Sequence, residues 1–123
     1  MALPFLKYPG GKRNIIDSLR THFPRKFNNY YEPFLGGGAV FFDMNNKKSI
    51  LNDINKNISN SYKNIKRYPK QIIAGLQKIS TNYKKLGSNE REVFYYRRRE
   101  DFNSLISDKN YGIENTILLI FFN

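Results

Sequence analysis

The sequence predicts an α/β fold in which a strand–turn–helix–strand unit is followed by helices, and three observations lead to this prediction. An apolar segment rich in β-forming residues, 29–34, leads into the glycine turn Gly36-Gly37-Gly38, after which residues 39–44 form a short apolar helical pattern. A second short strand pattern, residues 49–53, ends in a carboxylate. From residue 54 onward, apolar residues recur mainly at helical spacing.

Composition limits both the size of the fold and the kind of partner. A chain of 123 residues with 40% hydrophobic and 15% aromatic residues can build a packed core of one domain at most. The 21 Lys and Arg residues against 10 Asp and Glu residues give a net charge of +11, which favours a polyanionic partner, with nucleic acid ahead of a membrane surface or an acidic protein. The alternative is a solvated basic surface that has no partner.

Cysteine and histidine usage excludes several kinds of chemistry. The chain has no cysteine and a single histidine, His22, which excludes disulfides and cysteine nucleophiles and disfavours a metal site. The N-terminus lacks an apolar signal core, and no apolar run approaches the ~18 residues that span a bilayer. We therefore expect no metal, no membrane partner and a cytoplasmic protein.

The first segment combines an aromatic residue, a Pro-Gly-Gly loop and two lysines, Lys7 and Lys12. This arrangement suits an anion pocket, although two solvated lysines are equally compatible with it. A helix is expected to start near Lys12 and to end at Pro24. Its apolar face would be formed by Ile15, Ile16, Leu19 and Phe23.

The glycine turn could bind a nucleotide-like ligand or could simply turn the chain. Gly36 and Gly38 tolerate positive φ and let a ligand approach the backbone, while the following helix would offer free N–H groups. Asp53 lies 17 residues after Gly36, at the end of the second strand, where a carboxylate can accept hydrogen bonds from both ribose hydroxyls. Asp53 could also cap a helix that starts at Ile54, and the two roles are compatible.

The rest of the chain predicts helices. Residues 54–67 carry an apolar stripe at helical spacing, Pro69 opens a second helix, and residues 90–106 form a third. The stripe of the first of these helices consists of Ile54, Ile58, Tyr62 and Ile65. Residues 115–123 are nearly all apolar and should be buried, which favours the interpretation that this sequence is the front part of something larger.

Three consecutive arginines, Arg97, Arg98 and Arg99, lie in the middle of the third helix. Successive residues on a helix point about 100° apart, so the three side chains do not form one flat patch. Salt bridges to Glu100 and Asp101 would account for them, and phosphate contact by one of them is the alternative.

Three motifs in fixed order, residues 5–12, 31–38 and 51–55, resemble the N-terminal part of the Dam-type (D12 class) DNA adenine-N6 methyltransferases. The first resembles that family's aromatic-x-Gly-Gly-Lys motif, the second its E-P-F-x-G-x-G loop, and the third its acidic strand end. The resemblance implies an N-terminal part of a Rossmann-like cofactor domain over residues 1–67. It implies the start of a helical DNA-recognition subdomain over residues 68–123.

The resemblance also implies S-adenosyl-L-methionine as cofactor and double-stranded DNA as partner. By this resemblance Tyr8 and Lys12 line the methionine end of the cofactor and Asp53 holds the ribose. The loop beneath the cofactor would consist of Pro33, Phe34, Gly36 and Gly38. Lys7 would contact DNA near the mouth of the cofactor site, and Arg97 and Arg98 are further candidates for DNA contact.

The sequence departs from the family where the chemistry takes place. The family's D-P-P-Y motif grips a flipped-out adenine, but this chain has no Pro-Pro dipeptide and no proline after Pro69. We therefore assign no catalytic residue and expect no methyl transfer by the chain alone, with a complementary C-terminal chain as a candidate partner. A non-enzymatic basic nucleic-acid-binding module is the alternative. A nicotinamide-dependent Rossmann protein is disfavoured, because the Tyr8–Lys12 element would have no role there.

Overall fold

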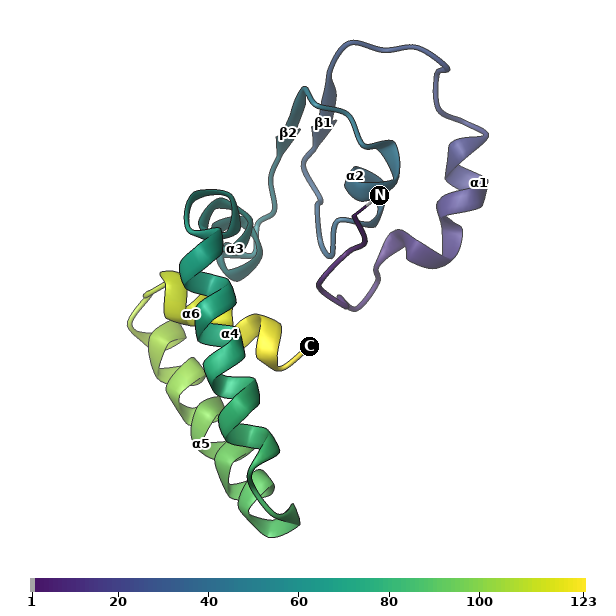
Figure 1. Ribbon diagram of the computed structural model, residues 1–123. Helices are drawn as coiled ribbons and strands as arrows, with labels where there is room; N and C mark the ends of the chain where they lie inside the picture. Colours follow the sequence, from purple (N-terminus) through teal and green to yellow (C-terminus); the bar gives the residue numbers. More distant parts are fainter. Residues whose placement is uncertain (1) are drawn as a thin grey trace. The chain divides into compact units, whose positions relative to one another are not determined.

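The computed structural model describes residues 2–123, and the chain divides into two compact units, residues 1–59 and 60–123. The first unit contains a 3₁₀ helix, η1 (Lys12–Ile15), followed by α1 (Ile16–Arg20), β1 (Tyr30–Glu32), α2 (Ala39–Met44) and β2 (Ser49–Leu51) (Figure 1). α3 (Lys56–Arg67) runs across the boundary between the units. The second unit continues with α4 (Pro69–Lys84), α5 (Ser88–Ser107) and α6 (Ile113–Phe121).

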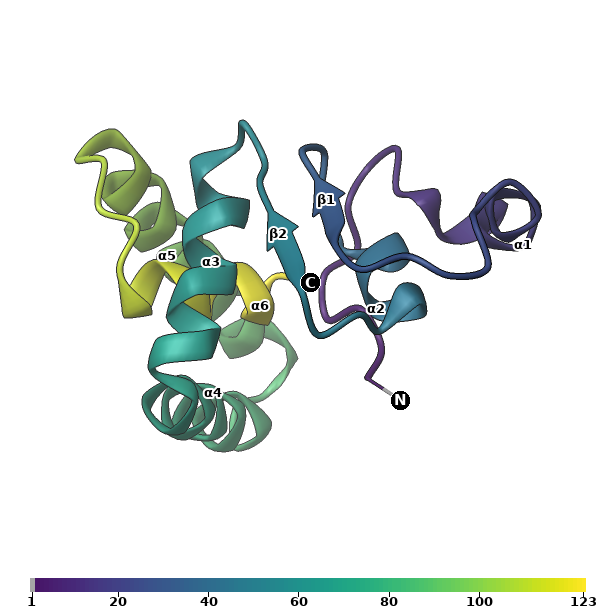
Figure 2. The ribbon, with the colours of Figure 1, turned by 90° about the horizontal axis from the view of Figure 1, so that it is seen from above.

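β1 and β2 form a small parallel sheet, which confirms the mixed helix and strand prediction. Both strands point the same way and lie side by side in Figures 1 and 2, with Tyr30 opposite Ser49 and Glu32 opposite Leu51. The connection from β1 to β2 passes through the glycine turn and α2, as a parallel pair requires a crossover rather than a hairpin. The carboxyl ends of both strands therefore lie at the same edge.

The helix predicted from Lys12 to Pro24 is shorter than expected. It begins as the 3₁₀ turn η1, and α1 ends at Arg20, where tight bonds from the His22 amide to the Leu19 carbonyl (2.9 Å) and from the Phe23 amide to the Arg20 carbonyl (3.3 Å) replace the α-helical pattern. The Thr21 hydroxyl also donates to the Ser18 carbonyl at 2.7 Å. Local polar bonds of this kind compete with helix propagation, and they end the helix before Pro24.

The stripe predicted for the helix after β2 is wrong at its first member. Ile54 is 96% exposed and precedes α3, which begins at Lys56. Asn55 caps this helix: its carbonyl accepts from the Ser59 amide at 3.1 Å and its side-chain oxygen accepts from the Asn57 amide at 3.0 Å. Asp53 therefore does not cap the helix, and Ile54 remains outside the helical face.

In the second unit α6 packs against both α4 and α5. A Cβ on Gly75 of α4 would lie 2.3 Å from the Ile117 Cδ1 atom, so the absence of a side chain there lets α4 and α6 approach closely. The rings of Tyr83, Phe94 and Phe121 meet pairwise at centroid distances of 6.0, 5.9 and 6.1 Å and join all three helices. Most of the apolar segment 115–123 lies in α6, and Leu118 in this helix is buried, as expected for an apolar segment.

A buried polar cluster links α6 to α3 within this unit. The Thr116 hydroxyl donates to the Ser61 hydroxyl at 3.2 Å, and the Asn64 amide donates to the Thr116 hydroxyl oxygen at 3.0 Å and the Tyr111 carbonyl at 2.9 Å. Asn115 is 1% exposed, yet neither atom of its side-chain amide has a hydrogen-bond partner within residues 2–123. An unpaired buried amide of this kind lowers stability.

None of the helices formed by residues 2–123 has both the length and the apolar character needed to span a bilayer.

Candidate cofactor-binding site

The three segments singled out in the sequence meet at the carboxyl ends of β1 and β2. A Cβ on Gly37 would lie 2.6 Å from the Leu6 carbonyl oxygen, and one on Gly36 would lie 3.5 Å from Tyr8 Cδ1. The side-chain amide of Asn55 donates to the Tyr8 hydroxyl at 3.2 Å. Residues 5–12, the glycine turn and the segment after β2 are therefore in mutual contact, as their expected sharing of one site requires.

Two glycines of the turn, Gly36 and Gly38, are required by their backbone conformation, in addition to Gly37, where the close Leu6 carbonyl leaves no room for a side chain. Gly36 has φ +53° and Gly38 has φ +79°, both in the left-handed region that side chains disfavour. The Leu35 amide donates to the Asn52 carbonyl at 3.0 Å, and the Gly38 amide donates to the Leu35 carbonyl at 2.9 Å. The turn is thus tied to the end of β2 and folded back on itself before α2 begins.

Asp53 holds the glycine turn against the end of β2. One carboxylate oxygen accepts from the Gly36 amide at 2.8 Å and the other accepts from the Asn55 amide at 2.9 Å. Each carboxylate oxygen has a second lone pair, so the group keeps acceptor capacity after making both bonds. Its position at the strand end agrees with the position expected for a ribose-binding carboxylate, and the structure adds a role in fixing the turn.

Glu32 was not among the residues selected from the sequence, yet it organises the start of the loop. It is largely buried, and its two oxygens accept from the Tyr30 hydroxyl at 2.6 Å and from the Phe34 amide at 3.0 Å. The Lys12 ammonium lies 3.8 Å from the same carboxylate and donates to the Phe34 carbonyl at 2.7 Å. Both backbone polar groups of Phe34 are therefore held by side chains. The signal in the sequence was a carboxylate at an inward position of a strand, directly before the loop.

The buried Glu32 carboxylate also affects the hydroxyl of Tyr30, which donates to it. Partial burial of its ring, then the hydrogen bond and negative charge of Glu32, raise the pKa of the Tyr30 hydroxyl. The phenol therefore remains a hydrogen-bond donor to Glu32 across the physiological range of pH.

Several large apolar side chains close to Gly36 or Asp53 in the sequence are exposed. Phe34 lies two residues before Gly36, and Ile54 directly follows Asp53, whose carboxylate accepts from the Gly36 amide. Both apolar side chains are strongly exposed. Pro33 and Tyr8 are also exposed. The sequence interpretation missed Ile54, because spacing alone placed it on the buried face of a helix. No group of three or more histidine or acidic side chains that could hold a metal gathers within residues 2–123.

The candidate DNA-contacting residues fall in both units. Lys7 is exposed in the segment that carries Tyr8. In α5, Arg98 pairs with Asp101 at 2.9 Å and lies over the Phe94 ring, and the Arg99 guanidinium donates to the Tyr95 hydroxyl at 3.3 Å. Arg97 is exposed, and no ion pair forms with it in the described part of the chain. The salt-bridge interpretation therefore holds for Arg98.

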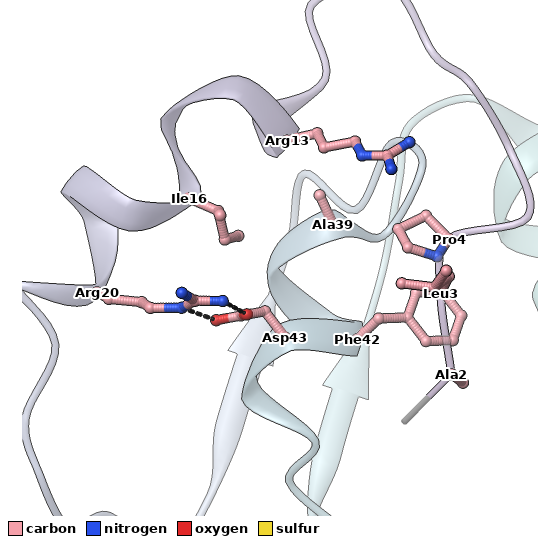
Figure 3. Close-up of a pocket in the computed structure, with 9 residues that line it drawn as sticks. All are labelled: Ala2, Leu3, Pro4, Arg13, Ile16, Arg20, Ala39, Phe42 and Asp43. Carbon is pink, nitrogen blue, oxygen red and sulfur yellow. Dashed lines mark hydrogen bonds and ion pairs between the residues drawn. The ribbon is translucent and has the colours of Figure 1, made fainter.

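A cavity of about 200 Å³ lies beside α2 (Figure 3). Its wall includes an ion pair between Arg20 and Asp43, with the Arg20 Nε atom 2.9 Å from one carboxylate oxygen. The hydrogen bond from Arg20 holds the pKa of the Asp43 carboxyl below its usual value. The other lining residues are Ala2, Leu3, Pro4, Arg13, Ile16, Ala39 and Phe42. None of the predicted cofactor residues lines this cavity.

The parallel strands, the intervening glycine turn and the carboxylate at the second strand end define an α/β unit of the kind that binds nucleotide-like ligands. Comparison with known proteins identifies the family: the model for the D12 class N6 adenine-specific DNA methyltransferases matches residues 8–123, and the chain belongs to this family. The resemblance drawn from the three motifs is thereby confirmed.

Individual relatives agree with the family. The type II methyltransferase M1.LlaDCHI of Lactococcus lactis subsp. cremoris is 33% identical over 118 residues, which cover 96% of this chain and 39% of the relative. M.MjaIII of Methanocaldococcus jannaschii is 35% identical over 85% of this chain and 39% of its own length. The DNA adenine methylase of Haemophilus influenzae is 32% identical over 98% of this chain, again 39% of its length. The chain thus spans about two-fifths of the length of these curated relatives.

Proposed function

We propose that this chain forms the cofactor-binding part of an adenine-N6-specific DNA methyltransferase, with S-adenosyl-L-methionine as methyl donor. The observation that carries the proposal is the meeting of Tyr8, the glycine turn and Asp53 at the carboxyl edge of a parallel strand pair. Ligands of open α/β sheets bind at that edge. The proposal includes a Rossmann-like sheet, of which β1 and β2 would be two strands.

The residues at the strand ends fit the parts of such a cofactor. The Asp53 carboxylate keeps acceptor capacity for the two ribose hydroxyls while it holds the turn. Phe34 and Ile54 offer exposed apolar surfaces beside it, which suit the faces of an adenine ring. Tyr8 and Lys12 would line the methionine end, with Lys12 fixing the loop through the Phe34 carbonyl.

Orientation of the cofactor is the contribution we assign to this chain. The bound cofactor would supply a methyl group on a sulfonium to an adenine amino group. The backbone of residues 34–36 is already held by hydrogen bonds with the side chains of Lys12, Glu32 and Asp53. Binding of the cofactor would therefore cost little conformational entropy in this loop. The D-P-P-Y motif is absent, so we assign no catalytic residue and infer that a complementary chain supplies that part.

Double-stranded DNA is the proposed substrate. The net charge of +11 favours a phosphate-rich partner, and exposed Lys7 and Arg97 are the candidate phosphate contacts. Arg98 is a weaker candidate because it pairs with Asp101. We propose residues 1–67 as the N-terminal part of the cofactor domain and 68–123 as the start of a helical DNA-recognition subdomain.

Calorimetric titration of the chain with S-adenosyl-L-methionine tests the cofactor assignment. We expect weak binding that Gly36→Val abolishes, because a β-branched residue is strained at φ +53°. Gly112→Ala, at a glycine outside the site with φ −80°, is the matched control and should leave binding intact. Equal affinity of wild type and Gly36→Val would remove the glycine turn from the site.

A non-enzymatic nucleic-acid-binding module is the second candidate function, and the basic charge is what favours it. Binding of duplex DNA through phosphates weakens steeply as salt rises, whereas cofactor binding should change little. Salt-sensitive DNA binding together with no measurable cofactor binding would favour the module. Cofactor binding that persists at high salt would favour the methyltransferase.

A further inference from the structure

The side-chain amide of Asn55 connects the start of α3 with the segment that carries Tyr8. Its oxygen accepts from the Asn57 amide at 3.0 Å, as in an N-cap, and its NH₂ group donates to the Tyr8 hydroxyl at 3.2 Å. The backbone amide of Asn55 donates in turn to the Asp53 carboxylate at 2.9 Å. One residue therefore contacts the candidate ribose carboxylate, the candidate aromatic residue of the methionine end and the first turn of a helix.

The helix cap decides which end of this amide faces Tyr8. A backbone N–H can only donate, so the Asn57 amide requires the oxygen of the Asn55 side chain and leaves the NH₂ group to face the Tyr8 hydroxyl. The hydroxyl is therefore an acceptor in this contact, and its own O–H remains available to donate to another group. Within residues 2–123, this amide is the only polar partner of the Tyr8 hydroxyl.

The rest of Tyr8 is held through its backbone and by the glycine turn. Its carbonyl accepts from the Gly11 amide at 2.9 Å, and its Cδ1 atom lies 3.5 Å from where a Cβ on Gly36 would be. Tyr8 is nevertheless 38% exposed, so packing alone does not fix the ring. The bond from Asn55 holds the hydroxyl end of the side chain.

We propose that Asn55 is a positioning residue for cofactor binding. It holds the Tyr8 ring beside the glycine turn and leaves the Tyr8 O–H to donate to the carboxylate of the cofactor's methionine end. A carboxylate accepts stronger hydrogen bonds than a neutral group does, so the direction of this hydroxyl matters for affinity. The inference rests on the proposed function, because that proposal places Tyr8 at the methionine end.

Asn55→Ser separates the bond to Tyr8 from the helix cap. Serine is as good an N-cap as asparagine, but its shorter side chain has no NH₂ group to offer Tyr8. Calorimetry should show binding of S-adenosyl-L-methionine weakened by about threefold to tenfold in Asn55→Ser and in Tyr8→Phe, as for the loss of one hydrogen bond. The double variant should bind like Tyr8→Phe, because Asn55 acts through that hydroxyl. Asn82→Ser, at an exposed position of α4 in the other unit, is the matched control and should bind like wild type.

Adenosine distinguishes positioning of Tyr8 from a general effect on the fold, because it lacks the methionine end. Its affinity, measured by competition with S-adenosyl-L-methionine, should be the same in wild type, Asn55→Ser and Tyr8→Phe. Equal loss of affinity for both ligands would overturn the inference, and so would additive losses in the double variant. Wild-type affinity for S-adenosyl-L-methionine in Asn55→Ser would overturn the inference alone and leave the proposed function standing.

Fluorine NMR of the chain labelled with fluorotyrosine tests the contact without any cofactor. The Tyr8 resonance is the one missing from Tyr8→Phe, and it should shift in Asn55→Ser but not in Asn82→Ser. An unshifted resonance would overturn the inference whatever the wild-type chain binds. A shifted resonance together with no binding of S-adenosyl-L-methionine by the wild-type chain would overturn the proposed function, and the inference with it, while the contact between Asn55 and Tyr8 stands.

Discussion

Replacing Asp53 by alanine should loosen the glycine turn and abolish cofactor binding together. The substitution removes the acceptor of two backbone hydrogen bonds, from Gly36 at 2.8 Å and from Asn55 at 2.9 Å. Hydrogen bonds to charged groups contribute ~1.5–3 kcal/mol each, and half-burial of the carboxylate places these bonds in the lower part of that range. We therefore expect a loss of about 3–4 kcal/mol in the free energy of unfolding. Urea unfolding followed by circular dichroism, with amide exchange at Gly36, measures it.

Asp53→Asn separates the two roles of the carboxylate. Asparagine keeps one acceptor oxygen, so it can retain one of the two backbone bonds, but its NH₂ group cannot accept from a ribose hydroxyl. We expect about half the stability loss of the alanine variant and complete loss of measurable S-adenosyl-L-methionine binding. Unchanged stability in Asp53→Ala would refute the claim that this carboxylate holds the turn. Unchanged cofactor affinity in both variants would remove Asp53 from the cofactor site.

Two further predictions concern stability away from the site. Asn115→Leu should raise the free energy of unfolding by about 1–3 kcal/mol, because it replaces a buried, unpaired amide with an apolar group of similar size; a lower urea midpoint would show that the amide is satisfied. Because Arg20 lowers the pKa of Asp43 in the folded chain, the unfolded chain binds the proton more readily. The stability from this pair is present above the carboxyl's unfolded pKa of about 4 and is lost as pH falls through the lower folded pKa. Asp43→Asn should remove this part of the pH dependence below about pH 5, and an unaltered profile would contradict it.

The local pattern of the sequence predicted the framework of the site well. Apolar strand patterns on both sides of three glycines gave β1, β2 and α2, and the distance from Gly36 to Asp53 put a carboxylate beside the turn. These features depend on residues near each other in the chain. The left-handed backbone at Gly36 and Gly38 could likewise be anticipated, since glycine is the residue that adopts it at no steric cost.

Contacts between distant residues could not be read from the same pattern. Lys12 reaches the Phe34 carbonyl 22 residues away, and no spacing rule predicts that partner. Glu32 belongs to a loop motif in the sequence, but its hydrogen bonds with the Tyr30 hydroxyl and the Phe34 amide are visible only in the structure. Ile54 fitted a helical stripe by spacing, yet Asn55 caps α3 one residue later and leaves Ile54 in solvent. In each case a competing local or long-range bond decided the outcome.

The contacts that fix the glycine turn also set an order of events during synthesis. The turn is held from one side by Lys12, which the ribosome makes early, and from the other by Asp53 and Asn55. It therefore cannot close until residue 55 has left the exit tunnel, but it needs none of the helices α4, α5 and α6. Domains generally fold as units from the N-terminus while translation continues. On this reasoning the nascent chain can shape its ligand loop while the helical unit that follows is still being made.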